Sequence, residues 1–217
     1  LLPITEENKI EEKITCKDCD ESQCVGNCCK VGVITNEELR NRIFNGETLE
    51  NIFEEVGKWD NNGIACVTYN GLYNFINTKI QLISDEWFDN VYAFYEGFAC
   101  VKLEGKGWNF MNQKGEIAFP NQWFDDAESF SEGFAKVKLK GQGWNFINQN
   151  GKYLKPNQWF NRVGYFRDGI TRVKLDGKGW NFINQKGEYL SPNQWFDDVI
   201  SFHNGYANVV LNGDSYY

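Results

Sequence analysis

The stretch Gly105-Lys106-Gly107-Trp108-Asn109-Phe110 decides the fold, because the chain repeats it at a fixed interval. It returns at Gly141 to Phe146 and again at Gly177 to Phe182, each time 36 residues further on. A fixed period of roughly 20–50 residues is the sequence signature of a tandem-repeat protein. The surrounding sequence keeps this step in units that begin near 97, 133, 169 and 205, and a shorter first unit begins near 63.

Each unit opens with a predicted β-hairpin. Residues 134–139 alternate an apolar face (Ala135, Val137, Leu139) with a second face that carries two lysines. A period of two with one apolar face is typical of a half-buried strand. The glycines of 141–143 predict a tight turn, and Trp144 begins the returning strand.

The second part of the unit is expected to form another small hairpin. A tight turn at 149–151 precedes a short third strand at 153–154, and Pro156 stops it because proline cannot donate to a neighbouring strand. A fourth extended stretch is predicted from Trp159 to Phe166. The fold class is therefore mainly β, with two small hairpins in each unit.

Two arrangements of these units fit the period. The favoured one is an elongated stack of hairpins, in which each unit buries its aromatic side chains against its neighbours. The alternative is a small β-propeller. The first unit, from Gly63, has 34 residues and lacks the Pro-Asn-Gln motif, which is typical of a terminal capping repeat.

The spacing Gly-Trp-x-Phe-Ile-Asn-x-x-Gly resembles the WG-repeat family, short β repeats found in many bacterial proteins. The resemblance covers about 63–217, with Gly-Trp-Asn where the family usually has Trp-Gly, as at Gly143, Trp144 and Asn145. It implies an all-β array and no single biochemical activity.

The N-terminal part differs in composition from the repeats. A Cys-rich acidic segment is expected over 1–34, a short helical hairpin over 35–61 and the β-repeat domain over 62–217. Thr35 and Glu38 have capping-box spacing, and an apolar stripe of Leu39, Ile43 and Phe44 follows. Asn45-Gly46 ends this helix, and a second helix is predicted from Thr48 to Val56, docked on the first repeat as a cap.

The first segment contains closely spaced cysteines that are candidates for a zinc site. Zinc prefers four thiolates in a tetrahedron, and two close pairs in a short loop can supply them. The alternatives are free thiols, disulfides in an exported protein, and an iron–sulfur cluster. The predicted ligands are Cys16, Cys19, Cys24 and Cys28, with Cys29 in competition for the fourth place.

Repeated tryptophans form two rows that are candidates for a binding surface. One row contains Trp108, Trp144 and Trp180, which we expect to be structural. Exposed aromatic rows bind sugars or organic cations, and the second row is the better candidate for such a role. Its predicted partner-binding residues are Trp123, Trp159 and Trp195, with the preceding Asn121, Asn157 and Asn193.

Composition and motifs argue against several classes of function. The chain carries one His and shows no phosphate-binding or nucleophile–base motif, so we expect no enzyme activity. A net charge of −8 disfavours nucleic-acid binding, and no apolar run is long enough for a membrane span. No signal peptide is visible, which slightly favours a cytoplasmic location, although the sequence starts at Leu1 and the true start can precede it.

The sequence thus favours a non-catalytic repeat protein that offers a protein-interaction or scaffold surface. The first alternative is glycan or cell-wall binding through an aromatic row. The second is an accessory repeat region of a larger enzyme or toxin.

Overall fold

The computed structural model describes residues 32–200, 202 and 205–216. Two helices come first, and five three-stranded antiparallel sheets follow in this part of the chain. The helices are α1 (Asn36–Phe44) and α2 (Leu49–Ile52). The sheets contain β1 (Glu55–Val56), β2 (Ile64–Tyr69) and β3 (Leu72–Asn77); β4 (Asn90–Tyr95), β5 (Phe98–Leu103) and β6 (Gly107–Asn112); β7 (Asp126–Ala127), β8 (Phe134–Leu139) and β9 (Gly143–Asn148); β10 (Arg162–Val163), β11 (Ile170–Leu175) and β12 (Gly179–Asn184); and β13 (Asp198–Val199), β14 (Val209–Leu211) and β15 (Asp214–Tyr216).

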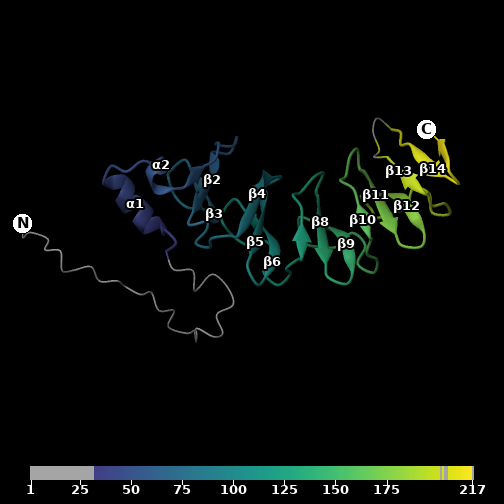
Figure 1. Ribbon diagram of the computed structural model, residues 1–217, viewed down its shortest axis with the longest axis horizontal. Coiled ribbons are helices and arrows are strands. Elements are labelled where there is room, and N and C mark those ends of the chain that lie inside the picture. The colour runs from purple at the N-terminus through teal and green to yellow at the C-terminus, as the bar shows by residue number, and fades with distance from the viewer. Residues whose placement is uncertain (1–31, 201, 203–204, 217) are drawn as a thin grey trace, which may run out of the picture.

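The sheets follow one another along the long axis of the molecule (Figure 1). The sheet that contains β2 lies next to the helices, and the sheet that contains β14 lies at the opposite end. The described repeats therefore form an open, elongated array and not a closed propeller. This confirms the arrangement that the sequence favoured.

The predicted division of each unit into two hairpins is wrong. In the third unit, the hairpin of β8 and β9 is regular, and β7 from the preceding unit is its third strand. The predicted strand at 153–154 is reduced to one bridge between Tyr153 and Ile147. Only four residues, 152–155, separate the turn at 149–151 from Pro156, which cannot donate to a neighbouring strand, so a regular strand does not form there.

A short extended segment joins consecutive sheets. The N–H and C=O groups of Phe160 both pair with Trp144 of β9, at 2.8 and 2.7 Å. The next residue, Asn161, points the other way and donates its N–H to the carbonyl of Lys174 in β11 at 2.9 Å. Alternate backbone groups of one strand point to opposite sides, so one segment holds two sheets.

The second glycine of each Gly-x-Gly turn is required by this joint. Gly143 has a φ of 110°, and a Cβ atom placed on it would lie 2.5 Å from the carbonyl oxygen of Phe160. No side chain fits that distance, and positive φ is costly for residues other than glycine. The Gly-Trp pair thus marks the place where the connecting segment crosses the hairpin.

The hydrophobic core lies between units and not within them. Phe110, Phe119 and Phe124 of the second unit pack with Ala135 and Val137 of the third in one buried cluster. Acidic side chains at the hairpin tips add a polar contact between units, since the carboxylate of Glu132 accepts from the backbone N–H groups of Asp168 and Gly169 at 2.9 and 2.8 Å. Each unit therefore needs a neighbour to bury its apolar face.

In the first unit, the helices replace that neighbour. Ile34 and Leu39 are buried with Ala65, Val67 and Ile76 of the first sheet. The predicted cap is confirmed in this respect, and so is the N-cap, because the hydroxyl of Thr35 accepts from the N–H of Glu38 at 3.2 Å.

Two details of the helical prediction are wrong. Phe44 is 91% exposed, because the helix ends at this residue and its side chain does not reach the sheet. The second helix ends at Ile52 instead of Val56, since Phe53 takes an extended conformation and Glu55–Val56 pairs with β2 as β1. Pairing with an open strand edge outweighs the weak helical preference of this short segment.

Candidate functional site

The first tryptophan row is structural, as expected. Trp108 and Trp180 are 7% and 8% exposed, and Trp144 is half-buried. Lysines of the neighbouring strand cover the rings, with the Nζ atoms of Lys102 and Lys174 at 5.7 and 5.6 Å from the ring centres of Trp108 and Trp180. A cation over an indole ring is an attractive contact, so these lysines stabilise the hairpins.

The predicted binding row of Trp123, Trp159 and Trp195 is more open. All three side chains are half-buried. Trp159 and Trp195 contact Tyr153 and Tyr189 with ring centres 5.1 Å apart. The second row therefore has exposed aromatic area at the spacing of the repeat, although part of each ring belongs to the packing of its own loop.

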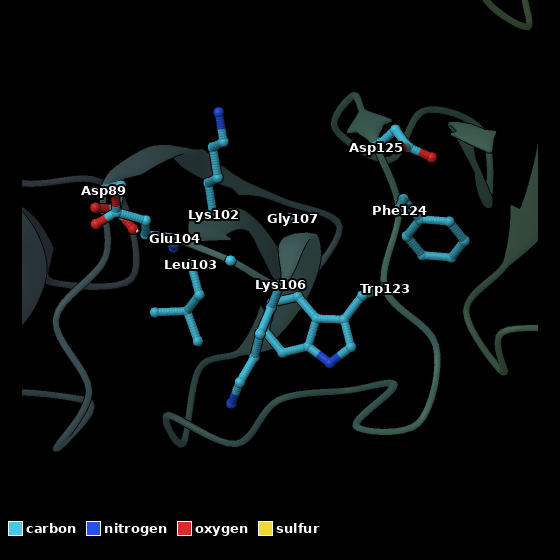
Figure 2. Close-up of a pocket in the computed structure, with 10 residues that line it drawn as sticks. Asp89, Lys102, Leu103, Glu104, Lys106, Gly107, Trp123, Phe124 and Asp125 are labelled. Carbon is cyan, nitrogen blue, oxygen red and sulfur yellow. Dashed lines mark hydrogen bonds between the residues drawn. The ribbon is translucent and has the colours of Figure 1, made fainter. Parts of the chain in front are cut away.

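A recess of about 580 Å³ lies at Trp123, lined by residues of the second unit and by Asp89 of the first. Figure 2 shows the indole ring on one side and Asp89 and Glu104 across from it. The side chain of Lys106 runs along the indole, with Nζ 5.5 Å from the ring centre. The carboxylate of Asp89 accepts from the backbone N–H of Glu104, which fixes the wall of the recess.

The predicted asparagines of this site lie beside the row, not in the recess. Asn121, Asn157 and Asn193 are exposed in the Pro-Asn-Gln turns. None of their side chains forms a hydrogen bond with another residue of the described chain. The structure thus brings each Trp and Asn together only as neighbours in one turn.

The asparagine that follows the first tryptophan of a unit, or Tyr73 in the first unit, was missed as a key residue. Asn145 is completely buried, and its Nδ2 atom donates to the carbonyls of Lys155 and Gln158 at 2.8 and 3.1 Å. Its Oδ1 atom accepts from the N–H of Phe146 at 2.8 Å. Its invariance among the units was the available signal, and the same buried contacts are made by Asn74, Asn109 and Asn181.

The aspartates after the second row have a structural role as well. The carboxylate of Asp125 accepts from the backbone N–H of Lys140, in the hairpin turn of the next unit. The third unit has Asn161 at this position, and its Oδ1 atom accepts from the N–H of Asp176 at 2.7 Å. These side chains therefore cap the hairpin turns of the next unit.

A ridge along one side of the array has the most variable residues. It comprises positions one or two residues before, and one residue after, a Phe that each connecting segment repeats. This Phe is constant, partly buried at Phe94 and buried at Phe130 and Phe166, whereas the flanking side chains change from unit to unit. We refer to the flanking residues Tyr92, Tyr95, Glu128, Ser131, Tyr165, Arg167 and Ile200 as the variable ridge.

Large apolar side chains of the ridge are exposed to solvent. Tyr92, Tyr95 and Tyr165 are 46%, 56% and 51% exposed, and Ile200 is 61% exposed. A groove of about 570 Å³ runs between the tyrosines, with Asp126 and Glu128 among its other lining residues. Variation between otherwise near-identical units was visible in the sequence. The ridge was nevertheless not predicted as a site, because the prediction relied on the repeated tryptophans.

The two described thiols are not reactive candidates. Burial raises the pKa of the Cys66 thiol to about 11, with a smaller contribution from Glu55. Burial also raises the pKa of Cys100, and the nearby carboxylates of Asp126 and Glu128 raise it further. Both cysteines stay protonated near neutral pH and act as packing residues.

The predicted metal ligands Cys16, Cys19, Cys24 and Cys28 lie outside the described residues, as does His203. Residues 32–200, 202 and 205–216 contain no cluster of three or more metal-binding side chains. In the same part of the chain, no helix has the length and apolar character needed to cross a membrane.

Comparison with known families agrees with the repeat structure. The model described as "WG containing repeat" matches four tandem copies, at 75–106, 108–144, 144–178 and 180–213, which is more than half of the chain. The protein belongs to the family of WG-repeat proteins. No match was found among proteins with curated descriptions.

Several solved structures are distantly similar. They include the computationally designed Ika8 protein (9% identity, TM-score 0.42, covering 74% of this chain and 56% of that one) and BamB from Moraxella catarrhalis (8%, 0.41, 71% and 53%). A third is the WD40 β-propeller domain of Doa1 (12%, 0.35, 71% and 60%). The chain spans just over half the length of the first two, and at these TM-scores the likeness says nothing about activity.

Proposed function

We propose that the array is a non-catalytic scaffold whose variable ridge binds another protein. The observation that carries this proposal is the contrast between constant buried residues and variable exposed ones at neighbouring positions. Aromatic side chains such as Tyr92 and Tyr165 are enriched in protein interfaces. A patch of exposed tyrosines along an elongated array is a suitable surface for an extended partner.

Site-specific photocrosslinking tests the ridge directly. A photoreactive phenylalanine analogue is placed at Tyr165, on the ridge, and in a separate protein at Asn157, in the Pro-Asn-Gln turn. In an extract of the source cells, the ridge position should give a discrete protein adduct that Tyr92→Ala and Tyr95→Ala reduce severalfold. An adduct at Asn157 that is equally strong, or one that the ridge substitutions leave unchanged, would refute the proposal.

Glycan binding by the second tryptophan row is the other candidate, because the side chains of Trp159 and Trp195 are only partly buried. Stacking of a sugar on an indole face requires that face to be open. On a glycan array, retention that is lost with Trp159→Ala and kept with Tyr165→Ala would favour this function over the ridge.

We also propose that the N-terminal cysteines bind zinc, on the strength of their spacing alone. Protein purified without chelator should contain about one zinc per chain, and Cys16→Ser should reduce it sharply. A metal-free protein with every one of these thiols titratable would exclude the site.

A further inference from the structure

The groove on the ridge has an acidic floor between aromatic walls. Tyr92 and Tyr95 come from the second sheet, Asp126 and Glu128 from β7 and the residue after its end, and Tyr165 from the following connection. The walls are firm, since Tyr92 stacks on Trp108 with ring centres 5.3 Å apart and planes 11° apart. Tyrosine faces and carboxylates together attract organic cations.

Lys136 of the chain itself already contacts a carboxylate and a tyrosine ring at this groove. The Nζ atom of Lys136 lies 2.7 Å from the Oε2 atom of Glu128 and 3.7 Å from the centre of the Tyr165 ring. The hydroxyl of Tyr165 donates to the same oxygen of Glu128. Asp126 forms no ion pair within 4 Å in the described part of the chain. Lys138 lies opposite Asp126 in the pairing of β7 with β8, but its Nζ atom lies 5.6 Å from the ring centre of Trp144. The carboxylate of Asp126 is therefore available to a cation of a partner.

The carboxylates of Asp126 and Glu128 also lie on the same side of their segment. Asp126 and Glu128 are two residues apart on an extended segment, which places their side chains on the same face. Both of them add to the raised pKa of the Cys100 thiol, whose main cause is burial. Their negative potential is therefore concentrated at one place under the ridge.

The equivalent positions one unit further on have the opposite character. Arg162 stands in place of Asp126, and Gly164 in place of Glu128. Arg172 replaces Lys136 and donates to the carbonyl of Val199 at 2.9 Å. The acidic floor is thus a feature of one junction in the array and not of the repeat.

From these contacts we infer that the groove between Tyr92, Tyr95 and Tyr165 binds an arginine or lysine side chain of the partner protein. The guanidinium or ammonium group lies between the tyrosine rings and donates to Asp126 and the free oxygen of Glu128. This inference deepens the proposed scaffold function and depends on it, because it names the chemistry that the ridge recognises.

Binding of N-acetyl-arginine amide to the whole protein, followed by NMR, tests the inference. Binding should appear at millimolar concentration and weaken severalfold between 50 mM and 500 mM salt, since the attraction is electrostatic. The affinity should fall about five- to tenfold in Asp126→Asn and in Tyr95→Ala. Asp198→Asn is the matched control, because Asp198 holds the same repeat position two units away and should leave the affinity unchanged.

Three results would overturn the inference. They are a lack of binding, an equal loss in Asp198→Asn, and binding of tetramethylammonium as tight as that of the arginine amide. The last would show that hydrogen bonds to the carboxylates contribute nothing. The photocrosslink at Tyr165 separates the two proposals, because its persistence in Asp126→Asn with no arginine binding retains the scaffold and rejects only the cation.

Discussion

Trp87 in the first unit and Trp159 in the third hold the same position of the repeat, yet their surroundings differ. Trp87 is 2% exposed, packs in the cluster that contains Ile34 and Leu39, and donates its indole N–H to the carbonyl of Ile34 at 3.2 Å. Trp159 is half-buried and contacts Tyr153. The repeat itself therefore does not decide whether this tryptophan is core or surface, and the neighbouring segment does.

The same comparison applies to the backbone of the connecting segment. The side chain of Asn36 receives the N–H of Leu82 at 2.7 Å and donates to its carbonyl at 3.2 Å. An amide side chain thereby imitates a neighbouring strand at the open edge of the first unit. The N-terminal segment therefore binds backbone groups at the edge of the first unit that a further unit would otherwise bind.

The largest expected effect is the loss of stability when Trp87 is replaced, which tests its comparison with Trp159. Trp87→Ala should lower the free energy of unfolding by about 3–5 kcal/mol, because it leaves a cavity in a packed cluster. Trp159→Ala should cost roughly 1–2 kcal/mol, in proportion to its smaller buried area. Urea denaturation followed by circular dichroism measures both, and equal losses would show that the cap does not cover Trp87.

The second effect concerns the buried asparagine that every complete unit shares. Asn145→Ala should cost about 2–4 kcal/mol, because several backbone groups of the loop lose their partners in a buried site. The exposed Asn157→Ala in the same loop should change stability by less than about 0.5 kcal/mol. A loss at Asn157 that matches the loss at Asn145 would contradict the role assigned to the buried amide.

A smaller effect is expected at the edge of the cap. Asn36→Ala removes the two hydrogen bonds to Leu82 and should cost about 1–2 kcal/mol. Hydrogen exchange of the Leu82 amide should accelerate in this variant, while the Phe160 amide, in the third unit, stays protected. Unchanged exchange at Leu82 would mean that Asn36 does not hold the edge.

The smallest effect is a pH dependence of the first unit. The thiol of Cys66 has an ordinary pKa of 9.0 and a pKa of about 11 in the folded chain. The unfolded chain loses this proton first as pH rises, so stability should fall between about pH 9 and 11. The difference in absorbance near 240 nm between the unsubstituted protein and Cys66→Ala cancels the other six cysteines and the tyrosines. This difference should show a thiolate transition near pH 11, and a difference transition near pH 9 would contradict the burial.

The sequence predicted the parts of the fold that depend on short-range pattern. The alternation of 134–139 and the two glycines of 141–143 correctly located the hairpin, and Thr35 correctly located the start of α1. These features follow from the preferences of neighbouring residues, which a sequence displays directly.

The parts that failed depend on pairing between distant segments. Glu55–Val56 became a strand because β2 offered it an edge, and Phe160 became a joint because two hairpins meet there. The candidate site followed the same rule. Its tryptophans were found from their repetition, while the ridge was missed because its residues share a surface and not a motif.

The most direct test of the account is fluorine NMR of protein labelled with 5-fluorotryptophan, with a gadolinium chelate dissolved in the buffer. Single Trp→Phe substitutions assign the resonances. The account predicts strong broadening of the Trp159 and Trp195 resonances and almost none of the Trp87 resonance. Broadening of Trp87 equal to that of Trp159 would contradict the central claim that the N-terminal segment closes the first unit of an otherwise open array.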